Sequence, residues 1–137
     1  MTMLKFSKFN QTRKNSVGNK FNASKVKSYK GTFDSKLEYE YSLILDDDVR
    51  LKRIIGYNRQ VAIDLYGINK TRVASYKLDF LIHHKDESLE YVEVKGYPTD
   101  TWRLKWKLAK DWLKSQPAGT KLTLVDSNLG VKESHKA

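Results

Sequence analysis

Two carboxylates and a lysine stand in two neighbouring apolar segments of the chain. Residues 78–96 read LDFLIHHKDESLEYVEVKG, with Asp79 in the first β-prone run and Glu93 and Lys95 in the second. Acidic residues are depleted in strands, so two of them at inner strand positions need a reason. Carboxylates bind divalent cations and lysine stabilises charge on a phosphate, so metal-dependent phosphodiester chemistry is the first reaction to consider.

The spacing predicts that the two acids face each other. With strands over 76–82 and 89–96 and a turn centred near Asp86, Asp79 stands directly opposite Glu93, with Cβ atoms roughly 5 Å apart. Such like charges repel unless a cation lies between them, and Mg²⁺ accepts oxygen ligands with water completing its shell. Lys95 shares the face of Glu93, where it can hold a water or neutralise charge on a phosphate. The alternative is a surface charge ladder on a solvated sheet.

A helix upstream of these strands can supply a third carboxylate. The segment FDSKLEYEYSLILDDD predicts a helix over 33–45, because its apolar residues recur at helical spacing. Asp34 or Ser35 is the expected N-cap. We expect the helix to fade at Asp46–Asp48, since acids at a C-terminus oppose the helix dipole. Glu38 and Glu40 both lie at edges of the apolar stripe, and periodicity does not choose between them.

The remaining pattern completes an α/β fold. Val61, Ile63 and Leu65 alternate as in a strand, a second helix is predicted over 100–115, and KLTLVD forms a last short strand. The order is helix, three antiparallel-connected strands, helix and strand on a central mixed sheet. We expect a basic, flexible nucleic-acid-binding arm over 1–32, one folded domain over 33–126, and a frayed tail over 127–137.

The charge distribution favours a polyanionic partner. The chain of 137 residues has a net charge of +10, and residues 1–33 contain eight Lys and Arg and no acid. Such a segment is expected to become ordered on a phosphate backbone. Helix 100–115 interleaves three tryptophans with further cations. The predicted nucleic-acid contacts are Lys14, Lys20, Lys25, Lys27, Lys30, Lys36, Arg103, Lys105 and Lys107.

Composition also limits the compartment. The chain contains no cysteine, which excludes a disulfide framework and a thiolate metal site. It has no apolar run of membrane-spanning length and no apolar core of a signal peptide near its N-terminus. We therefore expect a soluble, cytoplasmic protein with no membrane partner.

Three short motifs resemble those of the PD-(D/E)XK nuclease superfamily. They are SKLE at 35–38, YKLDF at 76–80 and VEVKG at 92–96. The set is most similar to small phage-encoded endonucleases and junction-resolving enzymes of the phage endonuclease I type, which share a Ser-x-x-Glu helix, a Pro-Asp-Phe strand and a Glu-x-Lys-Gly strand. The resemblance covers roughly residues 32–115. One departure is Leu78, which stands where those proteins have proline, and this leaves the subfamily and its substrate open.

The resemblance implies a restriction-endonuclease-like core and a metal-dependent endodeoxyribonuclease acting in a bacterial host cell. It implies a catalytic set of Glu38, Asp79, Glu93 and Lys95, with Glu38 preferred over Glu40. Mg²⁺ would be held by the three carboxylates, with Mn²⁺ as a substitute. Gln60 falls in the strand where such nucleases often carry an active-site glutamine, although a solvated strand residue is the equal alternative.

Alternatives to a DNA endonuclease stay open on sequence alone. One is a non-catalytic DNA- or RNA-binding protein on a nuclease-like scaffold, and another is an RNA nuclease. Cutting at junctions requires two coordinated cuts and therefore a homodimer, but no stretch of the sequence identifies a dimer interface.

Overall fold

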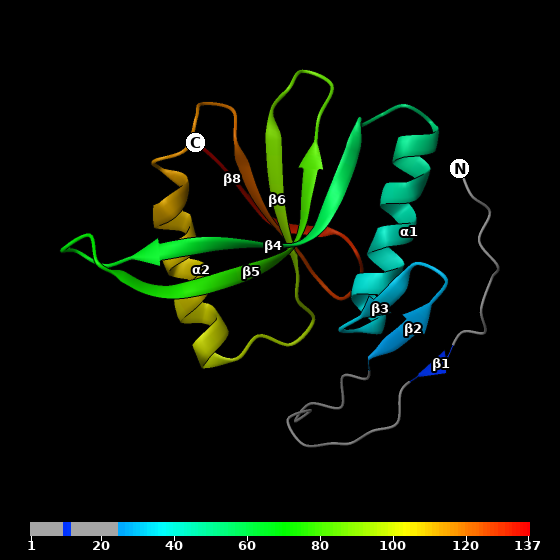
Figure 1. The fold of residues 1–137 in the computed structure, drawn as a ribbon, viewed down its shortest axis with the longest axis horizontal. Coiled ribbons are helices and arrows are strands. Elements are labelled where there is room, and N and C mark those ends of the chain that lie inside the picture. The colour runs from blue at the N-terminus through cyan, green and yellow to red at the C-terminus, as the bar shows by residue number, and fades with distance from the viewer. Residues whose placement is uncertain (1–9, 12–24) are drawn as a thin grey trace.

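The computed structural model describes residues 10–11 and 25–137 (Figure 1). Its elements in chain order are β1 Asn10–Gln11, β2 Val26–Ser28, β3 Gly31–Phe33, α1 Lys36–Arg50, β4 Gly56–Tyr66, β5 Arg72–His83, β6 Leu89–Val94, α2 Asp100–Leu113, β7 Lys121–Val125 and β8 Val131–Lys136. The two helices and the strands between and after them confirm the predicted mixed α/β class. In the described ranges, neither helix is long and apolar enough to cross a membrane.

The central sheet is mixed. Its strands lie in the order β4-β5-β6-β7-β8, and all neighbours are antiparallel except β6 and β7, which are parallel. Helix α2 connects these two parallel strands, because a parallel pair needs a crossover rather than a tight turn. A separate small sheet has the order β1-β2-β3.

Helix α1 follows one of the two predicted N-caps, but it begins at Lys36 rather than at residue 33, because Phe33 belongs to β3, and it ends later than predicted. Ser35 is the N-cap, and its hydroxyl accepts a hydrogen bond of 3.0 Å from the backbone N–H of Glu38. The helix runs to Arg50, so the prediction that it fades at Asp46–Asp48 is wrong. The acids are tolerated because each has a cationic or phenolic partner nearby, such as Arg50, whose guanidinium lies 3.1 Å from the carboxylate of Asp47.

Part of the predicted flexible arm is a folded hairpin. Strands β2 and β3 pair antiparallel, and Phe33 at the end of β3 is 0% exposed. The guanidinium of Arg59 on β4 lies 3.5 Å from the centre of the Phe33 ring and donates a 2.7 Å hydrogen bond to the carbonyl of Thr32. The expectation of a flexible arm is therefore wrong for residues 25–32, because this hairpin buries an aromatic anchor. The rest of the arm, 1–9 and 12–24, lies outside the described residues.

The C-terminal segment is a strand rather than a frayed tail. Strand β8 pairs antiparallel with β7, and the backbone N–H of Ala137 donates a 2.8 Å hydrogen bond to the carbonyl of Thr120. Its sequence VKESHK has no apolar alternation, so hydrogen bonds of the sheet rather than a buried face hold it in place. The predicted boundary at residue 126 is therefore wrong, since the sheet continues beyond it.

The long β4–β5 hairpin contacts both hydrophobic cores of the domain. Phe80 of β5 belongs to the core cluster that packs against α1, whereas Leu78 belongs to the cluster that packs against α2. The change falls at Asp79, and Gln60 stands opposite it on β4 because the flanking residues pair in unbroken register. Figure 1 shows the outer half of this hairpin turning across α2. Asp79 therefore lies where the two cores meet.

Candidate active site

Asp79 and Glu93 face each other as the sequence predicts. The antiparallel pairs of β5 and β6 run from His83 opposite Leu89 to Phe80 opposite Val92, so the next position places Asp79 opposite Glu93. The backbone ladder stops there. Instead, Oδ2 of Asp79 accepts a 2.8 Å hydrogen bond from the backbone N–H of Val94. The predicted register is confirmed. At the acidic pair, the carboxylate of Asp79 accepts a backbone hydrogen bond in place of a backbone carbonyl.

Glu93 is buried, so its face of the sheet is not a solvated charge ladder. Its side chain lies under α2 and the residue is 5% exposed. Oε2 accepts a 2.9 Å hydrogen bond from the indole Nε1 of Trp102, which also donates to the hydroxyl of Tyr76 at 2.8 Å. Oε1 is buried and, within the part of the chain that the structure describes, has no hydrogen-bond partner. An orphaned carboxylate oxygen of this kind is costly unless a ligand or a proton satisfies it.

The environment of the pair disfavours two negative charges. Burial and the nearby charge of Glu93 raise the pKa of Asp79 well above its ordinary value. Burial also raises the pKa of Glu93, although hydrogen bonds from Tyr76 and Trp102 oppose this shift. Protonation of Asp79 would relieve the repulsion, because the protonated carboxyl group can donate a hydrogen bond to Glu93. A divalent cation would do the same while leaving both carboxylates ionised.

Gln60 links this pair to α1. Its backbone has φ 54°, which is left-handed and costly for a non-glycine residue inside a strand. The side-chain Nε2 of Gln60 donates a 2.5 Å hydrogen bond to Oε2 of Glu38. Burial, followed by the charge of Asp79, raises the pKa of Glu38 to about 7. Sequence position alone left Gln60 undecided, and the structure places it beside two of the predicted acids.

The two candidate acids of α1, Glu38 and Glu40, lie in different environments. Glu38 is 2% exposed, and its Oε1 accepts a 3.2 Å hydrogen bond from the backbone N–H of Asp34. Together with the bond from its own N–H to Ser35, this forms a variant of the capping box. Glu40 lies partly exposed, with a carboxylate oxygen 3.9 Å from the ammonium group of Lys36. Of these two acids, Glu38 is therefore the one that lies toward the site. It also caps the first turn of α1.

Lys95 directly follows β6 and lies beside the acidic pair. Its backbone N–H donates a 2.9 Å hydrogen bond to the carbonyl of Val125, which fixes its position against β7. Its positive charge lowers the pKa of both Asp79 and Glu93, against the larger effect of burial. The half-buried Lys95 also lines a groove of about 240 Å³ between α2 and β8. The lysine therefore connects the carboxylates to an accessible surface.

The oxygen ligands near Asp79 suit a hydrated metal ion better than an ion enclosed by protein groups. Across residues 25–137, no three His, Cys, Asp or Glu side chains lie close enough to form a ready-made metal group. Glu38 uses its oxygens on Asp34 and Gln60, so the structure does not bring it into a ligand set with the other acids. Mg²⁺ in proteins often takes only one or two carboxylates and keeps several waters. Asp79 and Glu93, with the orphaned Oε1, fit that pattern.

The lysines predicted to contact nucleic acid near the N-terminus differ in their exposure and ion pairing. Lys14 and Lys20 lie outside the described residues. Lys30 is engaged in the fold, because its ammonium group lies 2.6 Å from the carboxylate of Asp46 and its side chain is only 13% exposed. The other predicted lysines in this region are exposed, namely Lys25, Lys27 and Lys36.

The predicted cations of α2 divide between two flanks of the helix. Arg103 and Lys107 line the same groove as Lys95, as expected for residues four apart on one helical face. Lys105 does not line this groove. The sequence did not indicate that Trp102 donates a hydrogen bond to Glu93, since helical spacing does not reveal what an indole N–H contacts.

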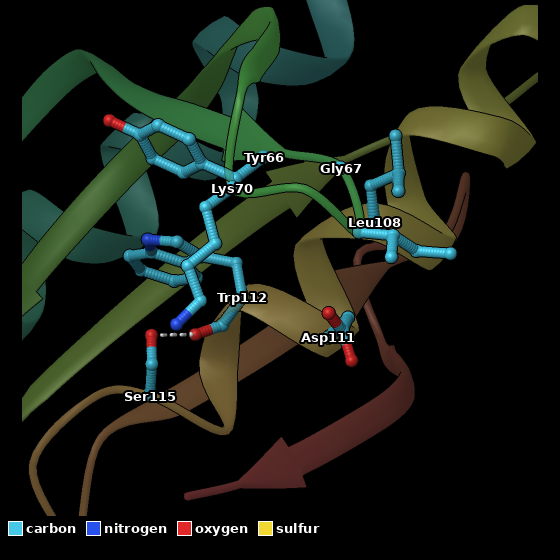
Figure 2. Close-up of a pocket in the computed structure, with 8 residues that line it drawn as sticks. Tyr66, Gly67, Lys70, Leu108, Asp111, Trp112 and Ser115 are labelled. Carbon is cyan, nitrogen blue, oxygen red and sulfur yellow. Dashed lines mark hydrogen bonds between the residues drawn. The ribbon is translucent and has the colours of Figure 1, made fainter.

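A second pocket of about 540 Å³ lies between the turn of the β4–β5 hairpin and α2. Figure 2 shows Tyr66 and Lys70 on the hairpin side and Trp112 on the helix side, with the hydroxyl of Ser115 donating a 2.8 Å hydrogen bond to the Trp112 carbonyl. None of the predicted site residues lines it. The acidic pair therefore lies apart from this pocket.

Comparison with known proteins places the chain in a family. No curated protein matches it. A family model described as "Protein of unknown function (DUF1064)" matches residues 18–121, a span that contains Glu38, Gln60, Asp79, Glu93 and Lys95. Because this match covers most of the sequence, the chain belongs to the DUF1064 family.

Proposed function

We propose that this protein is a metal-dependent endonuclease that hydrolyses phosphodiester bonds of DNA. The observation that carries the proposal is the buried pair of Asp79 and Glu93, with one carboxylate oxygen unpartnered and Lys95 alongside. The resemblance of the SKLE, LDF and VEVKG motifs to PD-(D/E)XK nucleases supports the same reading. We also propose that the helix–strands–helix–strand order corresponds to a restriction-endonuclease-like core.

Each residue of the site has a distinct task in this proposal. Asp79 and Glu93 would hold a hydrated Mg²⁺, which supplies an activated water and neutralises charge on the phosphate. Trp102, whose indole N–H donates to Oε2, and Tyr76 would orient Glu93 through their hydrogen bonds to its carboxylate. Lys95 would hold the attacking water or stabilise negative charge developing on the phosphate. Glu38 and Gln60 would position the backbone beside Asp79 rather than contact substrate.

The test is cleavage of linear, nicked and four-way-junction DNA with Mg²⁺ or Mn²⁺, read on a denaturing gel. Asp79→Asn and Glu93→Gln should each lower the rate by about 10²-fold or more, the scale of removing one electrostatic contact to a transition state. Asparagine keeps an oxygen that can accept from the Val94 N–H, so the fold should survive. Glu40→Gln removes one negative charge from the neighbouring helix and should leave the rate unchanged.

Binding is measured in parallel, without divalent metal, to separate chemistry from recognition. Asp79→Asn should bind DNA as well as the unaltered chain. If no DNA substrate is cut with either metal while binding persists, the proposal gives way to a non-catalytic DNA-binding protein. If RNA of the same sequence is cut and DNA is not, the assignment to DNA is wrong.

A further inference from the structure

The groove between α2 and β8 has a composition suited to a polyanion. It is lined by Lys95, Pro98, Trp102, Arg103, Trp106, Lys107, Lys110, Leu124, Lys132 and Glu133. Five of these ten residues are cations and one is an acid. The apolar members include Trp102 and Trp106, whose rings stack with centroids 5.5 Å apart. A wall of low polarity strengthens the interaction of nearby cations with an anion.

The single acid of the groove is already compensated. Oε1 of Glu133 accepts a 3.1 Å hydrogen bond from the indole of Trp106, and it lies 2.9 Å from Nε2 of His135 and 3.9 Å from Nζ of Lys110. By contrast, Lys107 and Lys132 are exposed and pair with no carboxylate among the described residues. Their charges are therefore available to a ligand.

A β-bulge directs Lys132 into the groove. Leu124 pairs with Glu133, but Val125 pairs with Val131, so Lys132 is the extra residue at the register shift. Lys132 and Glu133 are neighbours on a strand and yet both line the groove, whereas neighbours on a regular strand point to opposite faces. Bulges re-aim side chains in this way and occur beside functional sites.

From these contacts we infer that the α2–β8 groove binds the phosphodiester backbone of the DNA strand that reaches Lys95, with Lys107 and Lys132 as phosphate contacts from its two walls. The volume of about 240 Å³ is below the roughly 300–1,000 Å³ of pockets that enclose small molecules, which favours a chain passing along the groove over an enclosed ligand. The inference rests on the proposed function for the identity of the strand, but binding tests it separately from cleavage.

The experiment measures the affinity of a fluorescent DNA duplex as a function of salt, without divalent metal. The double variant Lys107→Ala with Lys132→Ala should bind more weakly and reduce the slope of log K against log salt by about two, because each phosphate contact contributes about one. The matched control is Lys114→Ala with Lys136→Ala, which removes the same charge from the C-terminal end of α2 and from β8. Lys114 is 81% exposed and does not line the groove, and Lys136 lines a different pocket with Lys85 and Lys121.

A second measurement needs no substitution. Bound DNA should protect Lys107 and Lys132 of the unaltered chain from acetylation, read by mass spectrometry, and leave Lys114 and Lys136 reactive. Equal slopes for the two double variants, equal protection of all four lysines, or no DNA binding by the unaltered chain would each overturn the inference. If the groove variant loses binding but the unaltered chain cleaves no DNA, the proposed function is wrong and the inference that the groove binds DNA still holds.

Discussion

The side-chain amide of Gln60 donates a hydrogen bond of 2.5 Å to Glu38, and this contact ties the left-handed residue of β4 to the first turn of α1. The two residues come from segments that share no local pattern in the sequence. Their contact places a strained backbone position next to Asp79, and strain of this kind is typical of functional sites.

The left-handed backbone of Gln60 should make a glycine variant more stable than a valine variant, the reverse of the usual order in a strand. Gln60→Val should lower the free energy of unfolding by about 1–3 kcal/mol, because a β-branched residue resists a φ of 54°. Gln60→Gly should be less destabilising, since glycine adopts this conformation without steric cost. Urea unfolding measures both. A valine variant as stable as the glycine variant would show that the backbone here is not strained.

Glu38 predicts a pH dependence of stability. Its pKa in the folded chain is about 7, above the ordinary 4.5, so the folded state favours the protonated form. The contribution of Glu38 to the free energy of unfolding should therefore be fully present below pH 4.5 and fall as pH rises toward about 7, by up to about 3 kcal/mol. Glu38→Gln should remove this contribution, because glutamine does not titrate and still serves in a capping box.

Urea unfolding of both proteins across this pH range measures the difference. Glu40→Gln is the matched control, since Glu40 lies on the same helix and is partly exposed. Asp79 and Glu93 add a slope of the same sign. Glu38→Gln should reduce that slope as well, because Asp79 and Glu38 raise each other's pKa through their charges. If Glu38→Gln and Glu40→Gln change the slope equally, the raised pKa of Glu38 is wrong.

Trp102 predicts a stability effect that depends on the charge of Glu93. Trp102→Phe keeps an aromatic ring but removes the indole N–H that donates to Oε2 of Glu93. A buried carboxylate that loses a donor costs about 1–3 kcal/mol, so stability should fall at neutral pH and recover where Glu93 is protonated. Trp112→Phe, whose ring packs edge-on against Tyr91 at 5.0 Å, should show no such recovery.

The hairpin of β2 and β3 predicts a cost for removing its anchor. Phe33 is 0% exposed, and Phe33→Ala should lower the free energy of unfolding by about 3–5 kcal/mol. Tyr29→Ala in the same hairpin should cost less, because Tyr29 is 39% exposed. Thermal melting compares the two variants. Equal losses would argue that the hairpin is not held through Phe33.

The sequence was sufficient for those parts of the fold that have local signals. Helix α1 has a Ser35 cap and helical spacing, and the β5–β6 register follows from the turn near Asp86. That register alone predicts that Asp79 lies opposite Glu93. The late end of α1 was missed because acids at its C-terminus find partners, such as Arg50, that propensity does not count.

The rest of the site depends on tertiary contacts that no short pattern encodes. Glu93 is in contact with Trp102 of α2, and the place of Lys132 is due to a bulge in a strand that has no apolar alternation. A one-residue shift in a strand reverses the face that each side chain occupies. The sequence therefore showed which acids could meet, but not what covers them or which cations surround them.

The polar sequence of β8 has a consequence beyond the domain itself. In the described sheet this strand forms one edge, and an uncovered edge can recruit the strand of another molecule. Lysines and a bulge at an edge discourage such pairing, and β8 carries Lys132, Lys136 and a register shift within six residues. The same strand that is proposed to hold a phosphate thus also protects the protein from aggregation through its own sheet.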